Sequence, residues 1–144
     1  MNVVEQLKEK FALDHIGLAV NSLEEGFEFY KSLGISPMTI EDVPSEKVRV
    51  GMLEMWNDCR IELLESTDQE GPISKFLQKK GPGIHHICFR VKNLRDLALQ
   101  LKNKKIRLIN EEPRPGAHGT EVVFIHPKSA NGVLVELSEK IGQN

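Results

Sequence analysis

Apolar and polar residues alternate along two stretches of the chain, one near the N-terminus and one past its middle. They read Asp14-His15-Ile16-Gly17-Leu18-Ala19-Val20 and His86-Ile87-Cys88-Phe89-Arg90-Val91. A period of two predicts strands, and in the first of them His15, Gly17 and Ala19 share one face. The larger apolar residues share the opposite face, where a helix can cover them. We therefore expect the small neighbours of His15 to leave room for a ligand beside its ring.

A helical pattern and three strand patterns follow the first stretch. Asn21 or Ser22 can cap a helix over 22–33, and Gly34 suits the turn that ends it. The first half therefore predicts a βαβββ unit. Its strands are predicted over 11–20, 36–43, 47–55 and 59–66, with turns at 44–46 and 56–58.

The same order of patterns returns after a connector over 67–83, which holds a short amphipathic piece. Asn93 can cap a helix over 94–104. A proline-rich loop over 112–119 either borders a binding site or makes a rigid connection. The strands of this half are predicted over 84–91, 106–110, 120–126 and 132–137, with a turn at 127–132.

Two copies of one unit predict the fold class. The repeats, at about 11–66 and 84–140, predict an α+β fold in which two tandem βαβββ units form an open eight-stranded cleft. With 144 residues, of which 40% are hydrophobic, we expect a single domain over 1–144. Residues 1–10 could form a short amphipathic helix, but we favour a leader packed against the domain through its apolar residues.

One histidine and one glutamate occupy matching places in each repeat. The separation is 47 residues from His15 to Glu62 and 50 residues from His86 to Glu136. A lone histidine on a half-buried strand is more often a hydrogen-bonded core residue than a ligand, but four residues repeated in type, order and spacing favour a shared site. Two imidazoles and two carboxylates suit a divalent transition metal such as cobalt, nickel, zinc or manganese. We predict one ion bound by these four residues.

Alternation also separates the predicted ligands from their neighbours. His85 is turned to the face opposite its neighbouring ligand, and Glu65 is likewise turned away from the ligand on its strand. We expect Glu65 and Glu139 to be solvated strand ends. Cys88 shares the predicted ligand face and could be a fifth donor, but a small buried thiol is the interpretation that we favour.

Charge and cysteine content narrow the classes of partner. The chain has 19 basic and 21 acidic side chains, a formal net charge of −2, and no long run of like charge. This balance argues against a nucleic-acid or membrane surface and favours a small-molecule partner. The two cysteines, Cys59 and Cys88, and the lack of an apolar N-terminal run predict a cytoplasmic protein with reduced thiols.

Four segments around these residues resemble those of a known family. The doubled βαβββ unit, with histidine and glutamate on its first and fourth strands, resembles the vicinal oxygen chelate superfamily, which includes glyoxalase I. Within it, the segments resemble the methylmalonyl-CoA epimerases, over about residues 11–140. They are Leu13-Asp14-His15-Ile16-Gly17-Leu18-Ala19-Val20, Gly81-Pro82-Gly83-Ile84-His85-His86-Ile87-Cys88, Arg114-Pro115-Gly116-Ala117-His118-Gly119 and His126-Pro127-Lys128-Ser129.

The resemblance implies a reaction and its partners. It implies a metal-dependent epimerase that interconverts (2R)- and (2S)-methylmalonyl-CoA by removing the α proton, through an enolate that the metal stabilises. It implies an acyl-CoA substrate and a homodimer. It also implies a divalent ion, for which we expect cobalt, with zinc, nickel or manganese as alternatives.

Inversion at the α carbon requires proton exchange on both of its faces, and two acid/base groups are the simplest solution. The resemblance assigns one role to Glu136, which would bind the metal and exchange a proton. The other base of the family lies near the start of the third strand, where either Ser45 or Glu46 matches, and we choose Glu46. Some relatives have glutamine in place of Glu62, and the extra carboxylate would weaken the Lewis acidity of the metal.

Three other functions use the same fold. A lactoylglutathione lyase of the glyoxalase I type would use the same kinds of ligand, and the GIHHI, PGAHG and HPKS segments favour the epimerase over it. An extradiol dioxygenase would bind iron through two histidines and one carboxylate, so a fourth ligand at Glu62 argues against it. A non-enzymatic binding or resistance protein would lack the metal ligands.

Overall fold

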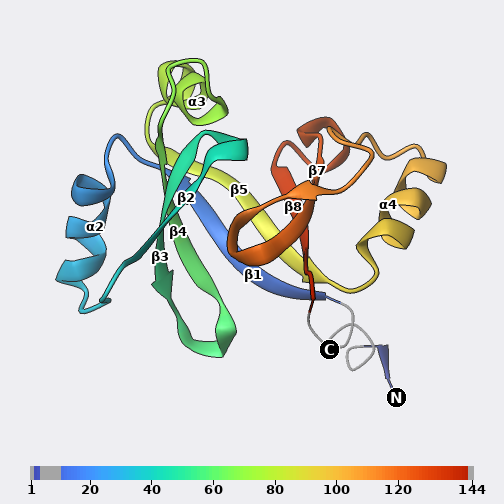
Figure 1. The fold of residues 1–144 in the computed structure, drawn as a ribbon, viewed down its shortest axis with the longest axis horizontal. Coiled ribbons are helices and arrows are strands. Elements are labelled where there is room, and N and C mark those ends of the chain that lie inside the picture. Colours follow the sequence, from blue (N-terminus) through green and yellow to red (C-terminus); the bar gives the residue numbers. More distant parts are fainter. Residues whose placement is uncertain (1, 4–10, 143–144) are drawn as a thin grey trace. The chain divides into compact units, whose positions relative to one another are not determined.

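The order of helices and strands repeats once along the chain, as the sequence pattern predicts. The computed structural model describes residues 2–3 and 11–142, so the prediction of a leader over 1–10 falls almost wholly outside the described residues. The helices and strands are β1 (Phe11–Ala19), α2 (Leu23–Ser32), β2 (Thr39–Val43), β3 (Val48–Glu54), β4 (Arg60–Ser66), α3 (Pro72–Lys80), β5 (Gly83–Val91), α4 (Leu94–Asn103), β6 (Arg114–Pro115), β7 (Thr120–Ile125) and β8 (Leu134–Lys140) (Figure 1).

Contacts between Cα atoms divide these elements into two units. The first unit is His15–His86, and the second joins the residues up to Asp14 with Ile87–Asn144. The boundaries fall inside β1 and β5, the strands that begin the two sequence repeats. Each unit therefore contains the helix and the three later strands of one repeat.

In the first unit the strand order is β2-β3-β4-β1. The hairpins β2–β3 and β3–β4 are antiparallel, whereas β1 runs parallel to β4 with Gly17 opposite Glu62. The core contains Leu23, Leu53 and Leu63, and Leu18 of β1 and Val20, which follows β1, pack against it. The apolar face of β1 therefore lies in the core that includes α2, as predicted from alternation.

In the second unit the strand order is β5-β8-β7-β6. Strands β7 and β8 are antiparallel over six residue pairs. Buried residues of these two strands pack against buried residues of α4. The core residues are Val91, Leu94, Ala98, Val123, Ile125, Val135 and Leu137.

The predicted strand over 106–110 is wrong in its extent. Only Leu108 forms a bridge there, to Ile125, and the second strand of the repeat is instead β6, two residues long. The left-handed backbone of Lys105 precedes the segment, with φ of 65°. Pro113 and Pro115 each lack the N–H that a regular ladder requires, which keeps this edge short.

A glutamate of the last strand binds the N-terminus of the helix in each unit. The Leu23 amide donates to Glu65 Oε1 at 2.9 Å, and the Asn93 and Leu94 amides donate to the two oxygens of Glu139 at 2.7 and 3.0 Å. The prediction that both glutamates are solvated strand ends is therefore wrong. A carboxylate at a helix N-terminus satisfies amides that the helix leaves without partners and favours the positive end of its dipole.

The two helices differ in their own capping residues. Ser22 caps α2 as predicted, since its Oγ accepts a hydrogen bond from the Glu25 amide at 3.1 Å. Asn93 precedes α4 but adopts a left-handed backbone, and its side chain makes no capping hydrogen bond. The predicted Asn93 cap is therefore replaced by Glu139.

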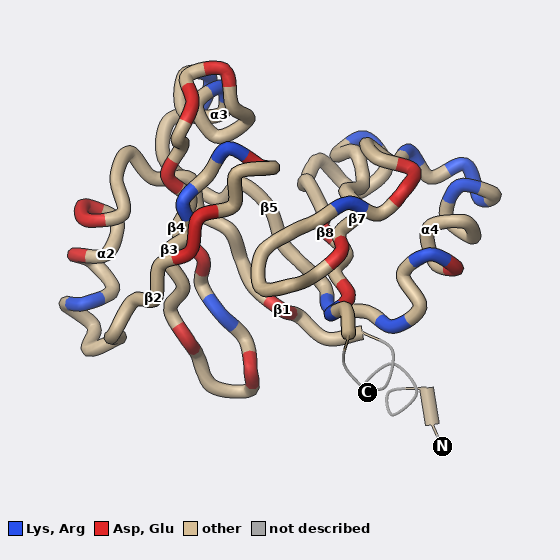
Figure 2. The backbone as a smooth tube through the Cα atoms, viewed as in Figure 1, with Lys and Arg blue, Asp and Glu red and all other residues tan. Residues whose placement is uncertain are grey.

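Charge is mixed over both units. Basic and acidic residues occur along each of them (Figure 2), and several pair on the surface, as Arg95 does with Glu112 and Glu121. No helix in the described part of the chain is long and apolar enough to cross a membrane.

Candidate metal centre

Two of the predicted ligands meet in the first unit. His15 on β1 and His86 on β5 are each 5% exposed, and their Nε2 atoms lie 3.0 Å apart. The rings are nearly perpendicular, at 86°, with centroids 5.1 Å apart. Two buried imidazoles that direct Nε2 to one point can share a cation there, because each neutral ring offers one lone pair.

Gly17 lets the two histidine rings approach each other because it has no side chain. A Cβ atom at this position would lie 2.6 Å from Nδ1 and 2.8 Å from Nε2 of His86. Such distances are shorter than any normal van der Waals contact, so a side chain here would displace the ring. The space expected beside His15 therefore exists, and the His86 imidazole fills it.

Glu62 contacts the other side of the His15 ring. Its Oε2 lies 3.3 Å from His15 Nδ1, and it accepts hydrogen bonds from Arg60 Nε at 3.1 Å and Nη2 at 2.7 Å. The carboxylate is 3% exposed, so its charge is buried and is balanced by the guanidinium. These contacts do not involve Oε1.

Sequence reasoning missed Arg60, although the signal was present. It lies two residues before Glu62 on the same strand, and residues at this spacing point to the same face. An arginine on the face of a buried carboxylate is the expected partner, because a buried charge is costly unless it is paired.

His85, which alternation predicts on the face opposite His86, contacts the His86 ring with its own ring. Its Nδ1 lies 2.9 Å from Nδ1 of His86, and the two rings stand nearly perpendicular at 89°. The edge of the ring also meets Phe76 of α3, with centroids 5.1 Å apart. The His85 ring therefore contacts both its neighbour in β5 and a side chain of α3.

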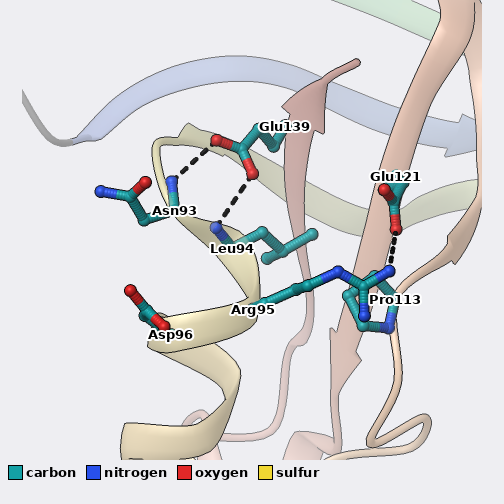
Figure 3. Close-up of a pocket in the computed structure, with 7 residues that line it drawn as sticks. All are labelled: Asn93, Leu94, Arg95, Asp96, Pro113, Glu121 and Glu139. Atoms are coloured by element: carbon teal, nitrogen blue, oxygen red, sulfur yellow. Dashed lines mark hydrogen bonds and ion pairs between the residues drawn. The ribbon is translucent and has the colours of Figure 1, made fainter. Parts of the chain in front are cut away.

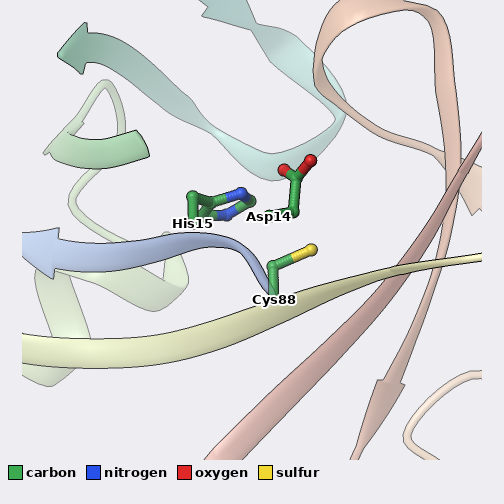
Figure 4. Close-up of side chains that lie close together, drawn as sticks. All are labelled: Asp14, His15 and Cys88. Atoms are coloured by element: carbon green, nitrogen blue, oxygen red, sulfur yellow. The ribbon is translucent and has the colours of Figure 1, made fainter. Parts of the chain in front are cut away.

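In the second unit, Glu136 lies half-buried on β8, opposite Phe124 of β7. Cys88 is the buried thiol that the pattern predicts, with no exposed surface, and its Sγ donates to Ser138 Oγ at 3.4 Å. Asp14, which the sequence did not single out, pairs with Arg90 at 3.3 Å and offers an oxygen within 4.8 Å of Cys88 Sγ. Figure 4 draws these two side chains with His15, the residue after Asp14 in β1.

Glu46 ends a 3-10 turn between β2 and β3. The turn spans Pro44–Glu46, and Glu46 is half-buried. The next residue, Lys47, has a left-handed backbone with φ of 57° and leads directly into β3. The glutamate therefore lies just before the third strand, as the sequence predicts, and its role in proton transfer stays a prediction.

The last two segments of the family resemblance, residues 114–119 and 126–129, each contain a 3-10 turn. In the first, Arg114 lies over the Phe124 ring at 5.1 Å, and His118 has a left-handed backbone. In the second, His126 Nδ1 accepts a hydrogen bond from the Lys128 amide at 3.0 Å. Desolvation and the charges of Arg107 and Lys128 lower the pKa of His126, which favours the neutral ring that can accept this bond.

A separate pocket of about 200 Å³ lies at the N-terminus of α4 (Figure 3). It is polar, and Glu139 and Arg95 already bind partners of the same unit there. None of the predicted ligands lines it. The lining residues are Asn93, Leu94, Arg95, Asp96, Pro113, Glu121 and Glu139.

Known proteins match this chain over nearly its whole length. Residues 14–124 match the model of the glyoxalase/bleomycin resistance protein/dioxygenase superfamily. The chain belongs to this superfamily. Membership confirms the predicted α+β glyoxalase-like fold, because the match covers the larger part of the chain.

Among the relatives in this superfamily is a mitochondrial methylmalonyl-CoA epimerase from Homo sapiens. It is 43% identical over 129 residues, which cover 88% of this chain and 73% of that protein. The crystal structure of methylmalonyl-CoA epimerase from Mycobacterium tuberculosis has a TM-score of 0.83 and 36% identity, covering 89% of this chain and 87% of that chain. A methylmalonyl-CoA epimerase in complex with methylmalonyl-CoA and NH4+ has a TM-score of 0.84 and 32% identity, covering 92% and 96%.

Proposed function

We propose that this protein is a methylmalonyl-CoA epimerase, which interconverts the (2R) and (2S) epimers of its acyl-CoA substrate. The observation that carries the proposal is similarity along nearly the whole chain to proteins of that name, one of them with methylmalonyl-CoA bound. The buried pair of histidines supports it, because the reaction needs a centre of positive charge close to a carbonyl oxygen.

The proposed metal ligands are His15, Glu62, His86 and Glu136. The facing Nε2 atoms of the two histidines support this set, as does the Glu62 oxygen that the contacts with Arg60 leave unused. Arg60 also offsets the extra negative charge that glutamate brings in place of glutamine. A bound divalent ion supplies a Lewis acid that stabilises the negative charge formed when the α proton leaves. We propose cobalt, with zinc, nickel or manganese as alternatives.

The proposed acid/base pair is Glu136 and Glu46. A proton must leave one face of the α carbon while another arrives at the opposite face, so each carboxylate would serve one face. Their positions support the assignment, since Glu136 is on the last strand, Glu46 lies just before the third, and both are half-buried.

Two further features belong to the proposal. We propose a homodimer, which the sequence resemblance implies. We also propose a cytoplasmic location, supported by the two cysteines, neither of which forms a disulfide.

Deuterium exchange at the α carbon of methylmalonyl-CoA tests the function. The purified protein, supplied with cobalt, should exchange the α proton of both epimers, and a chelator should stop the exchange. No exchange from either epimer would reject the proposal.

Glu46→Gln should slow exchange from one epimer more than from the other, and equal, wild-type rates would remove Glu46 from the mechanism. The glutathione hemithioacetal, assayed in parallel, should give no product.

A further inference from the structure

We propose that His85 is a positioning residue, which holds the His86 ring in the tautomer and orientation that bind a metal through Nε2. The inference rests on the proposed metal centre and adds to it a partner outside the ligand set. Its basis is the contact between the two Nδ1 atoms, at 2.9 Å.

A contact between two ring nitrogens needs one hydrogen between them. A neutral imidazole carries a single N–H, so the two rings must adopt complementary tautomers. If Nε2 of His86 gives its lone pair to a metal, its hydrogen must lie on Nδ1 and be donated to Nδ1 of His85. His85 then keeps its own hydrogen on Nε2. In metal sites the second nitrogen of a histidine ligand is normally held by such an acceptor.

The surroundings of His85 fix its ring for this task. It is half-buried, and its edge packs on Phe76 of α3 with an angle of 78° between the ring planes. The Lys80 ammonium lies 5.6 Å from the centroid of the same Phe76 ring. The helix between the two repeats thereby supports the His85 ring, and through it the ring of His86.

The other histidine has a partner of a different kind. If both Nε2 atoms gave their lone pairs to a metal, each histidine would carry its hydrogen on Nδ1 and would have an acceptor there, Glu62 at 3.3 Å for His15 and His85 for His86. On a third side, the His86 ring packs so closely on Gly17 that a Cβ atom there would lie 2.6 Å from its Nδ1. The His86 ring is therefore confined by His15, Gly17 and His85 together.

Two substitutions at His85 separate the hydrogen bond from the volume of the ring. His85→Asn places the side-chain oxygen of the amide where histidine has Nδ1 and so keeps an acceptor, whereas His85→Ala removes it. Affinity for Co²⁺ is measured by competition with a chelator of known affinity. His85→Ala should weaken it by about 10- to 100-fold, the usual effect of losing such a partner, and His85→Asn by less than about threefold. The visible spectrum of bound Co²⁺ should change in the alanine variant alone.

His126→Ala is the matched control. Its ring also accepts a hydrogen bond at Nδ1, from a backbone amide, so the variant removes a histidine without touching the centre. Its affinity for Co²⁺ should equal that of the wild type. Circular dichroism and thermal unfolding of the metal-free proteins show whether each variant is folded.

Nitrogen NMR of the metal-free protein gives a second measurement. At alkaline pH, His86 should carry its hydrogen on Nδ1 in the wild type and in His85→Asn, because both offer an acceptor to that nitrogen. In His85→Ala the two tautomers should mix. Unchanged affinity and an unchanged tautomer in the alanine variant would overturn the role of His85 alone. A wild-type protein that binds no metal would overturn the centre, and this role with it.

Discussion

In the first unit the glutamate of the last strand, Glu62, is bonded to Arg60 two residues before it on β4. In the second unit the corresponding position before Glu136 on β8 is occupied by Leu134. The two carboxylates thus occupy equivalent places in the repeat, but the residue two positions earlier on the strand is a cation in the first unit and leucine in the second. The difference favours a division of roles. Glu62 would orient the His15 ring and set the net charge of the proposed metal centre, and Glu136 would exchange the proton.

The residues before the two histidines also differ. Asp14 precedes His15 and pairs with Arg90, whereas His85 precedes His86 and contacts its ring. By contrast, Glu65 and Glu139 bind the helix N-terminus in both units. The contacts that hold a helix on its strand are repeated, and the contacts around the predicted ligands have diverged.

Exchange of each glutamate for glutamine tests the division of roles, and here we expect the largest effect. Glu136→Gln should slow α-proton exchange by about 10²- to 10⁴-fold, the usual cost of losing an acid/base group. Glu62→Gln should change it by less than about tenfold, because glutamine can still accept from Arg60 and the loss of one negative charge strengthens the Lewis acidity of the metal. Exchange rates at saturating substrate and cobalt provide the comparison. Similar losses in both variants would mean that the two carboxylates share one role.

Arg60→Leu gives the first unit the residue that the second unit has. It leaves Glu62 buried without its cation, so the metal-free protein should lose about 3 kcal/mol of unfolding free energy. Urea denaturation measures the loss. Arg49→Leu is the control, since its pairs with Asp42 and Glu65 are partly exposed, and it should cost less than about 1 kcal/mol. Equal costs would show that Arg60 has no special partner.

Gly17→Ala tests the room made for the His86 ring. The added Cβ meets the imidazole, so the ring must move, and we expect a loss of about 1–3 kcal/mol together with weaker binding of Co²⁺. Gly83→Ala, on β5, adds a methyl group that meets nothing within 4 Å and should be neutral. Thermal unfolding and chelator competition report the two effects. Unchanged metal affinity in Gly17→Ala would refute the steric argument.

The shared helix contact should give the smallest effect. Glu139→Ala removes the acceptor for two amides and should cost about 1–2 kcal/mol. Glu65→Ala should cost about 0.5 kcal/mol, because Ser22 still caps α2. Urea denaturation of both variants measures the difference. A larger loss from Glu65→Ala would reverse the comparison.

Alternation with a period of two predicted β1 and β5, because a strand with one buried face leaves little freedom of register. The repetition of histidine at the same place in both predicted that His15 and His86 share a site. Alternation did not predict the contacts of the His85 ring with His86 and with Phe76, because the face of a strand does not fix where a long side chain ends. It failed again for Glu65 and Glu139, since a polar residue at a strand end looks solvated until the helix that it binds is placed. The environment of such residues depends on tertiary contacts, which a local sequence pattern does not contain.

Gly17 also limits how far the two repeats can resemble each other. The repeat places Cys88 at the corresponding position, and its side chain is buried and bonded to Ser138. Glycine at position 88 would only remove a small side chain, but the Cβ atom of cysteine at position 17 would clash with the His86 ring and displace it. The sequence of the first repeat could therefore be copied into the second at this position more easily than the reverse. At this pair of positions, making the two repeats identical is expected to cost less when glycine replaces Cys88 than when cysteine replaces Gly17.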